Sequence, residues 1–419
     1  MKDARQALTW VRLIFAKKSI YQGGPTVQRF SSIFSQLLQL FPRLEFEQAV
    51  RKHRSDYSAK GFTSWGQFVA MLFCQFGRAH SLREICYGLA SCEGKLKHLG
   101  VPVSPKRSTL AYANAHRPWS LYQTVFEQLL AKCQSSVAGR RTRKKFRFKN
   151  KLVSLDASVI DLSLSLFNWA QFRRTKGAIK LHLLLDHDGY LPSFAVVTDG
   201  KTSDIRVARR LRFERGTVVV MDRGYIDYEW FVQLTHQGVY FVTRLKDNAL
   251  FEVVETRPVP AGNNIVRDQI VYFCAQAVPD REHFFRIVEV WDEENQRSFT
   301  FLTNNFDFAA TTIAAIYKDR WQVELFFKAI KQNLKIKTFL GTNANAVKTQ
   351  IWTALIAMLV LRYLQLMSTF GWSLSNLAAL LRHQLFVYRE LFAWLNEPFE
   401  GPPQLADAAK AQLSFGITS

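Results

Sequence analysis

The sequence predicts an α/β protein in which an all-helical N-terminal domain precedes a mixed sheet that carries helices and is interrupted by a β subdomain. Three observations predict this organisation. Apolar residues recur at helical spacing up to about residue 138 and at a period of two from Leu152. Strand-like and helix-like segments then follow in the order β-β-β-α-β-α-β up to residue 244. Residues 245–305 hold only strand-like runs, before helical spacing returns at residue 306.

The composition fits a folded multidomain protein with a polyanionic partner. The 419 residues, of which 48% are hydrophobic, are enough for two or three domains with cores. The net charge is +22, which indicates nucleic acid first and an anionic membrane surface second. A basic protein without such a partner is the alternative. Five cysteines without a C-x-x-C pair indicate a reducing cytoplasm, with neither a disulfide framework nor a zinc finger.

No segment has the pattern of a signal peptide or a membrane span. Lys17 and Lys18 follow a short apolar stretch without a small-residue cleavage site. The longest apolar run, Ile351–Val360, is too short to cross a bilayer and predicts a core helix. We therefore expect no membrane partner.

Residues 1–24 are expected to be an N-terminal arm, and residues 25–138 a helical DNA-binding domain. The expected helices span Thr26–Phe41, Ser64–Phe76, a segment opened by a Ser81–Glu84 capping box, and a segment from Ser104 to about His116. The last two could form a helix-turn-helix that binds DNA through Lys106 and Arg107. A plain helical bundle explains the pattern nearly as well, because the connection is longer than the usual turn.

A basic linker, residues 139–151, joins the helices to the sheet domain. Eight of the twelve residues from 140 to 151 are Lys or Arg, with Phe146 and Phe148 between them. The cations could bind DNA phosphates and the rings could stack on bases, whereas an inert solvated linker is the alternative. The expected DNA contacts here are Arg140, Arg141, Lys144 and Lys145.

Residues 152–244 are predicted to form the first part of the sheet domain. The expected strands are Leu152–Ile160, Ala178–Leu185, Leu191–Thr198, Thr217–Met221 and Val239–Arg244, and the expected helices are Asp204–Phe213 and Tyr228–Gln237. A turn over residues 186–189 makes the second and third strands a hairpin. This order is that of a ribonuclease-H-like sheet. After the β subdomain the core resumes over residues 306–345, followed by C-terminal helices (346–395) and a tail (396–419).

Two aspartates stand where such a sheet would place its chemistry. Asp156 lies within an apolar strand, where a carboxylate is costly unless it is paired or metal-bound. Asp222 ends the fourth strand. If the first and fourth strands are parallel neighbours, the two carboxylates meet.

A third acid, Glu324, lies in a predicted helix over Tyr317–Lys331. At 100° per residue Tyr317, Arg320, Glu324 and Lys331 share a stripe about 60° wide, beside an apolar face. Arg320 and Lys331 could bind phosphate oxygens, although Arg320 and Glu324 also have the spacing of a simple salt bridge. Trp321 adjoins the stripe and could stack on an extruded base.

Three ionised carboxylates in one place predict bound cations. Two unit charges 4 Å apart repel by about 4 kcal/mol at an effective dielectric constant near 20. Oxygen ligands suit Mg²⁺ or Mn²⁺, and two such ions could support phosphodiester cleavage.

The other polar residues of the domain have simpler explanations. Asp199, at a strand end, is the nearest rival as a ligand. The rest are assigned to the opposite strand face (Asp161), a turn (Asp186 and Asp188), a helix cap (Asp204) and strand packing (His182).

The spacing Y-x(2)-R-x(3)-E-x(6)-K of Tyr317, Arg320, Glu324 and Lys331 resembles the signature of the insertion-sequence-four family of DDE transposases. Asp156 in SLDASVIDLSLSLF and Asp222 in VMDRGY match the family's two aspartate motifs, and the resemblance covers about residues 150–370. It implies that Asp156, Asp222 and Glu324 are the catalytic metal ligands. It also implies Mg²⁺-dependent cut-and-paste transposition by DNA strand cleavage and strand transfer, with a hairpin intermediate on the transposon end.

The resemblance further implies partners and supporting residues. The partners would be double-stranded DNA, as terminal inverted repeats and target, and a second copy of the chain in the synaptic complex. The location would be the bacterial cytoplasm, at the nucleoid. Trp321 matches a family Trp that holds the flipped base, and Trp291 is a guess for a second aromatic from the insertion. Ser203 departs from a family G-x-x-H-D pattern, which we expect to affect a supporting contact and not the metal ligands.

Other functions are possible on the same residues. A transposase-derived DNA-binding protein without cleavage activity is the main alternative, and the complete acid triad argues against it. A metal-dependent phosphohydrolase using Asp156 and Asp222 would leave the charge of +22 unexplained. A tyrosine recombinase would need a nucleophilic Tyr and no metal.

Overall fold

The computed structural model describes residues 30–399 except 58, 93, 139–144, 164–166, 174–175, 260, 262–263, 274–282 and 337. The expected arm over residues 1–24 and most of the expected tail lie outside the described residues, as do Arg140, Arg141 and Lys144.

The N-terminal region is helical, as expected. It contains α2 (Ile33–Leu38), α3 (Arg43–His53), α4 (Ser64–Gly77), α5 (Leu82–Ala90), the short η1 (Leu96–Leu99), α6 (Arg107–His116) and α7 (Ser120–Ala138). Half of the predicted capping box is present: the Glu84 amide donates to the Ser81 hydroxyl at 3.1 Å, whereas the Glu84 carboxylate accepts from the His80 amide at 2.8 Å. The first expected helix, Thr26–Phe41, ends before Pro42 as predicted, but the next helix, α3, was not predicted. Pro42 also occupies the N-cap of α3, where its lack of an N–H costs nothing.

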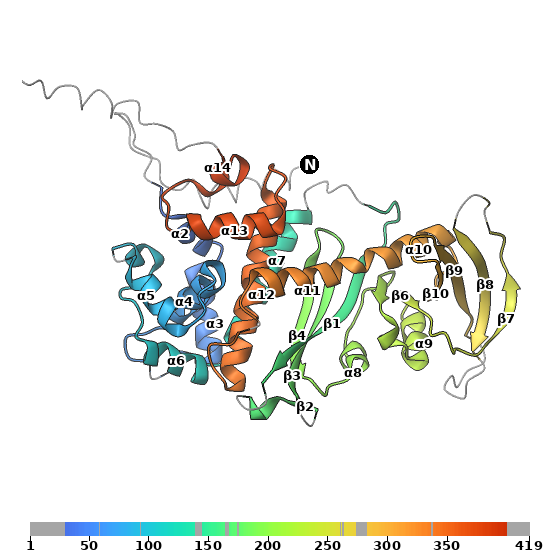
Figure 1. The fold of residues 1–419 in the computed structure, drawn as a ribbon, viewed down its shortest axis with the longest axis horizontal. Coiled ribbons are helices and arrows are strands. Elements are labelled where there is room, and N and C mark those ends of the chain that lie inside the picture. The colour runs from blue at the N-terminus through green and yellow to red at the C-terminus, as the bar shows by residue number, and fades with distance from the viewer. Residues whose placement is uncertain are drawn as a thin grey trace, which may run out of the picture.

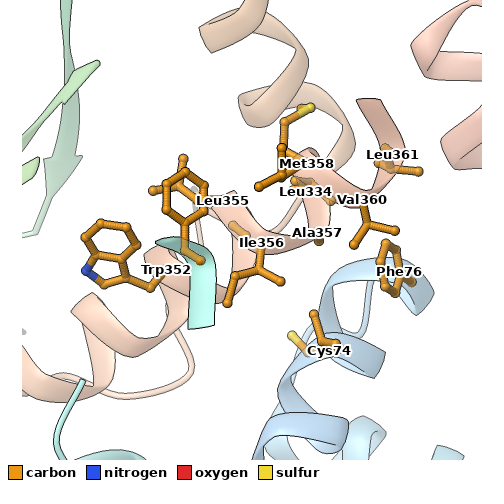
Figure 2. Close-up of a cluster of buried hydrophobic side chains, with 14 of the residues drawn as sticks. Cys74, Phe76, Leu334, Trp352, Leu355, Ile356, Ala357, Met358, Val360 and Leu361 are labelled. Atoms are coloured by element: carbon orange, nitrogen blue, oxygen red, sulfur yellow. The ribbon is translucent and has the colours of Figure 1, made fainter. Parts of the chain in front are cut away.

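Helix α12 (Ala344–Met367) joins the helical region to the sheet and contains the predicted core helix Ile351–Val360. Figure 2 shows Ile356 and Val360 of α12 among the buried side chains around Cys74 and Phe76 of α4. By length and composition α12 could cross a membrane, but 78% of its most apolar stretch is buried inside the protein. Its apolarity is therefore explained by its place in the core.

The strands form one mixed sheet (Figure 1). They are β1 (Leu152–Leu162), β2 (Gln171–Arg173), β3 (Lys176–Asp186), β4 (Leu191–Asp199), β5 (Val218–Met221), β6 (Tyr240–Arg244), β7 (Phe251–Thr256), β8 (Ile265–Phe273), β9 (Phe285–Asp292) and β10 (Arg297–Thr303). Their order is β2-β3-β1-β5-β6-β10-β9-β8-β7, with β4 also paired to β3. β5 is parallel to both β1 and β6, and the other pairs are antiparallel. The strands of the inserted segment extend this sheet, because β10 pairs with β6.

Helices cover both faces of the sheet. On one face, α8 (Asp204–Ala208) and α9 (Tyr228–His236) belong to the cluster that includes Val219 and Met221. On the other, α10 (Ala310–Asp319) packs on Val218 and Val220. The entirely apolar β5 is explained by this burial on both sides. Helix α8 is shorter than the predicted Asp204–Phe213, and α13 (Leu374–Gln384) and α14 (Leu391–Asn396) complete the C-terminal helices.

The predicted helix over Tyr317–Lys331 is in fact two helices, α10 and α11 (Trp321–Asn333), which form one rod across the sheet (Figure 1). Arg320 lies between them with helical backbone angles (φ −51°, ψ −32°). The hydrogen bonds at this junction are the tighter kind that spans three residues, from the Arg320 amide to the Tyr317 carbonyl and from the Val323 amide to the Arg320 carbonyl. The side-chain stripe therefore persists across a local change of helix geometry.

Candidate active site

Asp156 and Asp222 are brought together by two neighbouring parallel strands. Leu155 of β1 is the register partner of Met221 of β5, and each aspartate is the next residue of its chain. Because side chains alternate along a strand, Asp156 shares the face of Ser154, and Asp222 follows Val220 toward the side of α10.

Glu324 approaches this pair from the first turn of α11, which packs on β1. Its Oε1 accepts a hydrogen bond from Arg320 Nη2 at 2.5 Å. The other arm of the guanidinium, Nη1, lies 3.7 Å from Oδ2 of Asp156. The side chain of Arg320 is 10% exposed and thus bridges two of the three predicted acids.

The electrostatics of Asp156 reflect this crowding. The pKa of Asp156 is raised to about 7, chiefly by burial and also by the neighbouring Asp222 and Glu324, while the Ala157 amide and Arg320 oppose this rise. Asp222 is held by its own turn, because its Oδ1 accepts from the Gly224 amide at 2.9 Å. Negative charge here is therefore poorly compensated, although Arg320 is present.

The three carboxylates are suitable ligands for a hard divalent cation, but they do not converge into a complete metal site. Within the described ranges, no three His, Cys, Asp or Glu side chains converge closely enough to hold a metal ion. The three carboxylates nevertheless interact electrostatically, and the oxygen-only set suits Mg²⁺ or Mn²⁺. A cation would take over the charge compensation that Arg320 supplies to Asp156 and Glu324.

The remaining stripe residues line the approach to the acids. Tyr317 packs on Phe301, with ring centroids 4.6 Å apart, and burial raises its pKa. Trp321 is 56% exposed, unlike a core aromatic. Lys331 donates to the carbonyl of Val159 at 3.1 Å, beyond Asp156 on β1.

Trp291 lines a cavity of about 660 Å³ between the inserted strands and α10. The same cavity is lined by Phe299, Phe301 and Tyr317. Trp291 is 37% exposed, so part of its ring faces solvent. The cavity connects the stripe to the inserted strands through aromatic side chains.

The rival acids are occupied elsewhere. Asp199 accepts from the Thr202 amide (2.8 Å) and hydroxyl (2.5 Å), and Asp186 accepts from the Asp188 amide within the turn. The assignment of Asp204 as a helix cap was wrong, because Ser203 is the N-cap of α8 and Asp204 pairs with Lys180 at 3.0 Å.

Two further residues of β1 and β3 behave as predicted. Asp161 is exposed, at a register position opposite Ala178. His182 is packed, with Nε2 2.9 Å from the Thr198 hydroxyl, and burial lowers its pKa to about 4.

The candidate DNA contacts lie in two places. Lys106 and Arg107 are exposed at the start of α6, and Arg107 lines a surface cavity of about 550 Å³ with Arg83 and Ser108. Residues 91–106, including η1, separate α5 from α6, which is longer than a helix-turn-helix connection.

The end of the basic linker alternates between inward and outward side chains. Phe148 stacks on Phe146 and on Phe308, with ring centroids 5.1 and 4.7 Å away, so packing in the protein occupies part of the ring surface that was expected to stack on bases. Arg147, between the two rings, and Lys149, after Phe148, are exposed. Lys145 is paired with Asp319, Nζ to Oδ1, at 2.5 Å.

Two residues near the acids were missed from the sequence. Asp319 is buried, and its partners come from distant segments, so no local pattern marks it. Tyr225 is buried beside the acids, and its hydroxyl has no hydrogen-bond partner among the residues that the structure describes. The only sequence signal for Tyr225 is its position three residues after Asp222.

Comparisons with known proteins place this geometry in context. The family described as "Transposase DDE domain" matches residues 147–360, and a domain of unknown function, DUF4372, matches residues 29–102. The chain is similar to a putative transposase, y4zB, of Sinorhizobium fredii, at 31% identity over 72% of this chain and 82% of that protein. It is also similar to a probable transposase for insertion sequence element IS5377 of Geobacillus stearothermophilus, at 30% identity over 61% of this chain and 67% of that protein.

A solved structure of a piggyBac transposase synaptic complex with hairpin DNA aligns over 100% of this chain and 83% of that chain. The identity is 10% and the TM-score is 0.37, so this likeness carries no argument below.

Proposed function

The chain belongs to the transposase DDE domain family, and on this premise we propose that Asp156, Asp222 and Glu324 are the acids with which it cuts and rejoins DNA. It is a DDE transposase, an enzyme of DNA strand cleavage and strand transfer. The observation that carries the residue assignment is the meeting of three elements distant in sequence: β1, β5 and the start of α11. The proposed reaction is the cut-and-paste transposition of an insertion sequence.

The family's chemistry depends on divalent metal, and we propose two Mg²⁺ or Mn²⁺ ions held by Asp156, Asp222 and Glu324. Such ions, when bound, would supply an activated oxygen nucleophile and charge stabilisation at the scissile phosphate. The protein's own part is to hold three oxygen ligands on two interior strands of the sheet and one helix. Because the pKa of Asp156 is raised to about 7, a proton and a cation would compete for this carboxylate near neutral pH.

Arg320 and Lys331 are proposed to bind DNA phosphates beside the acids. Arg320 presents a fork of donors, which matches phosphate geometry, and it contacts two of the acids that surround the scissile group. Tyr317 supports the guanidinium, which lies 5.4 Å from the centre of its ring.

An extruded base is proposed to stack on Trp321, since this exposed indole adjoins the acids. Trp291, which lines the same cavity as Phe301 and Tyr317, is proposed as a second stacking residue. The aromatic side chains that line the cavity beside Trp291, namely Phe299, Phe301 and Tyr317, support a base as its occupant.

The core is proposed to be ribonuclease-H-like. The strand order β4-β3-β1-β5-β6, with β3 antiparallel and β1, β5 and β6 parallel, is the support for this assignment. Strands β7–β10 would be the insertion that separates Asp222 from Glu324.

DNA is the partner, and the finer assignments are proposals. They are a helical DNA-binding domain over residues 25–138 with contacts at Lys106 and Arg107, and linker contacts at Arg140, Arg141, Lys144 and Lys145. Terminal inverted repeats and target DNA would be bound by a homodimer in the synaptic complex, in the bacterial cytoplasm at the nucleoid. The charge of +22 supports this partner.

The test is strand cleavage by the purified full-length protein on labelled DNA carrying the ends of its own element. Wild type should nick these ends in Mg²⁺ and not in EDTA. Asp156→Asn, Asp222→Asn and Glu324→Gln should each bind the ends but cleave at least about 100-fold more slowly. Asp161→Asn, an exposed carboxylate on the same strand, is the matched control and should cleave normally. End binding by wild type without metal-dependent nicking would instead support the non-cleaving alternative.

A further inference from the structure

Asp319 is a buried carboxylate in the middle of the signature helix pair. Its side chain is 1% exposed, although it carries a formal charge. Oδ2 lies 2.5 Å from His187 Nδ1, and Oδ1 lies 2.5 Å from Lys145 Nζ. The Tyr190 hydroxyl donates to the same carboxylate, at 3.2 Å from Oδ2. Burial alone would raise the pKa of Asp319, but the hydrogen bonds and charges of His187 and Lys145 hold it below its usual value.

The partners of Asp319 belong to segments that frame the proposed active site. His187 and Tyr190 lie in the turn between β3 and β4, and Lys145 lies just before β1. The second ring nitrogen of His187, Nε2, is 2.7 Å from the hydroxyl of Ser154, which is two residues before Asp156 on β1. One chain of contacts therefore runs from the strand of the first acid, through His187, to Asp319.

The turn that supplies these partners is itself held in an unusual conformation. Tyr190 has φ +52°, a left-handed backbone that a bulky residue rarely adopts. Helix α12 contacts the turn, because Arg362 Nε donates to the Gly189 carbonyl at 3.0 Å. The guanidinium of Arg362 also lies 5.5 Å from the centre of the Tyr190 ring. The tertiary structure thus enforces a conformation that aims the Tyr190 hydroxyl at Asp319.

The position of Asp319 along the rod gives these contacts a consequence for the acids. Asp319 is the last residue of α10, and Arg320 forms the junction with α11. The side chain of Arg320 bridges Asp156 and Glu324, and Glu324 lies one turn further on. A side chain anchored immediately before the junction fixes where α11 begins relative to β1.

We propose that Asp319 is a positioning residue that, through Lys145, His187 and Tyr190, sets the place of Arg320 and Glu324 against Asp156. The inference rests on the proposed function of the three acids and adds a residue to it that touches none of the reacting atoms. A displacement of about 1 Å at a reacting group costs on the order of 100-fold in rate. Supporting partners of metal ligands are worth about 10- to 100-fold in metal affinity.

The test compares full-length wild type with Asp319→Asn and Asp319→Ala by two readouts. The first is single-turnover cleavage of the element's ends in Mg²⁺, expected to fall by about 100-fold. The second is Mn²⁺ affinity by titration without DNA, well below the melting temperature, expected to weaken by about 10-fold. Affinity for the ends should stay within about 3-fold of wild type, because the Asp319 side chain is buried and presents no surface to DNA.

Asp268→Asn is the matched control, because it removes a buried carboxylate of similar exposure that is paired with Arg286 at 2.6 Å in the inserted strands. It should lower thermal stability as the Asp319 variants do, but keep the cleavage rate and Mn²⁺ affinity of wild type. Wild-type Mn²⁺ affinity in Asp319→Asn, or equal losses in Asp319→Asn and Asp268→Asn, would overturn the inference. A different result would contradict the proposed function, namely cleavage that survives Asp156→Asn. The role of Asp319 is decided separately, by the Mn²⁺ titrations of the Asp319 variants.

Discussion

Asp222 follows the last residue of β5 that pairs with β1, and Asp156 follows that residue's partner, Leu155. The two carboxylates are 66 residues apart in the sequence (222 minus 156) but lie side by side on neighbouring parallel strands. Arg320 compensates part of their charge from the helix junction. This arrangement makes the site sensitive to pH and to cations, and both dependences can be measured.

Asp156 should contribute stability to the metal-free protein at pH 4, and this contribution should be lost as the pH rises to about 8. The pKa of Asp156 is raised from 3.8 to about 7 by burial, so in this window the folded chain holds a proton that the unfolded chain releases. Asp156→Asn removes this pH-dependent contribution to stability. The variant should gain on wild type by on the order of a few kcal/mol between pH 4 and pH 8, since one pKa unit corresponds to about 1.4 kcal/mol. Urea denaturation in EDTA at several pH values measures it.

Mg²⁺ should oppose this stability difference. It should raise the free energy of unfolding of wild type at pH 8 and leave that of Asp156→Asn unchanged. A stability difference between the two proteins that does not vary with pH would contradict the raised pKa of Asp156.

The inserted strands should depend on one buried ion pair. Arg286 and Asp268, 2% and 6% exposed, pair at 2.6 Å, and Arg286 also donates to the carbonyls of Asn305 and Phe308. Asp268→Ala should cost about 3–5 kcal/mol because a charge is left buried without its partner. The double replacement Asp268→Leu with Arg286→Met should cost less, as denaturant unfolding would show. Equal costs for the single and double variants would argue against this assignment.

The outward face of the basic linker should contribute to DNA affinity through phosphates. Arg147 and Lys149 are exposed, whereas Phe146 and Phe148 between and beside them pack inward. Arg147→Gln should weaken binding to specific and unrelated DNA alike, and lower the slope of log K against log salt by about 0.9. Arg147→Lys, which keeps the charge, is the control. An unchanged slope for Arg147→Gln would place the residue away from DNA.

Much of the sheet was predictable because its signals are local. The apolar runs of β1 and β5, with one Asp within the first and one after the second, are visible in the sequence. The strands of the insertion were also predicted, but their continuity with the sheet depends on the pairing of β10 with β6, a contact between distant segments. Helix α3 was missed because Pro42 follows the end of one helix and also precedes the start of the next.

The signature residues were predictable from spacing, whereas their support was not. The junction at Arg320 escaped prediction because its backbone angles remain helical and only the hydrogen-bond pattern changes. Asp319 stands at a variable position of the spacing pattern, and its partners Lys145, His187 and Tyr190 are more than 120 residues away by their numbers. Burial of a charge by such partners is a property of the tertiary structure alone.

The most direct test of the central claim is metal-specificity rescue of Asp222→Cys in the strand-cleavage assay. A thiolate binds soft or intermediate cations better than Mg²⁺. If Asp222 is a metal ligand, the variant should be at least about 100-fold slower than wild type in Mg²⁺. It should recover a large part of this loss in Mn²⁺ or Cd²⁺, which Asp222→Ala should not. Cleavage by Asp222→Cys at the wild-type rate in Mg²⁺ would contradict the claim that these acids hold the catalytic metal.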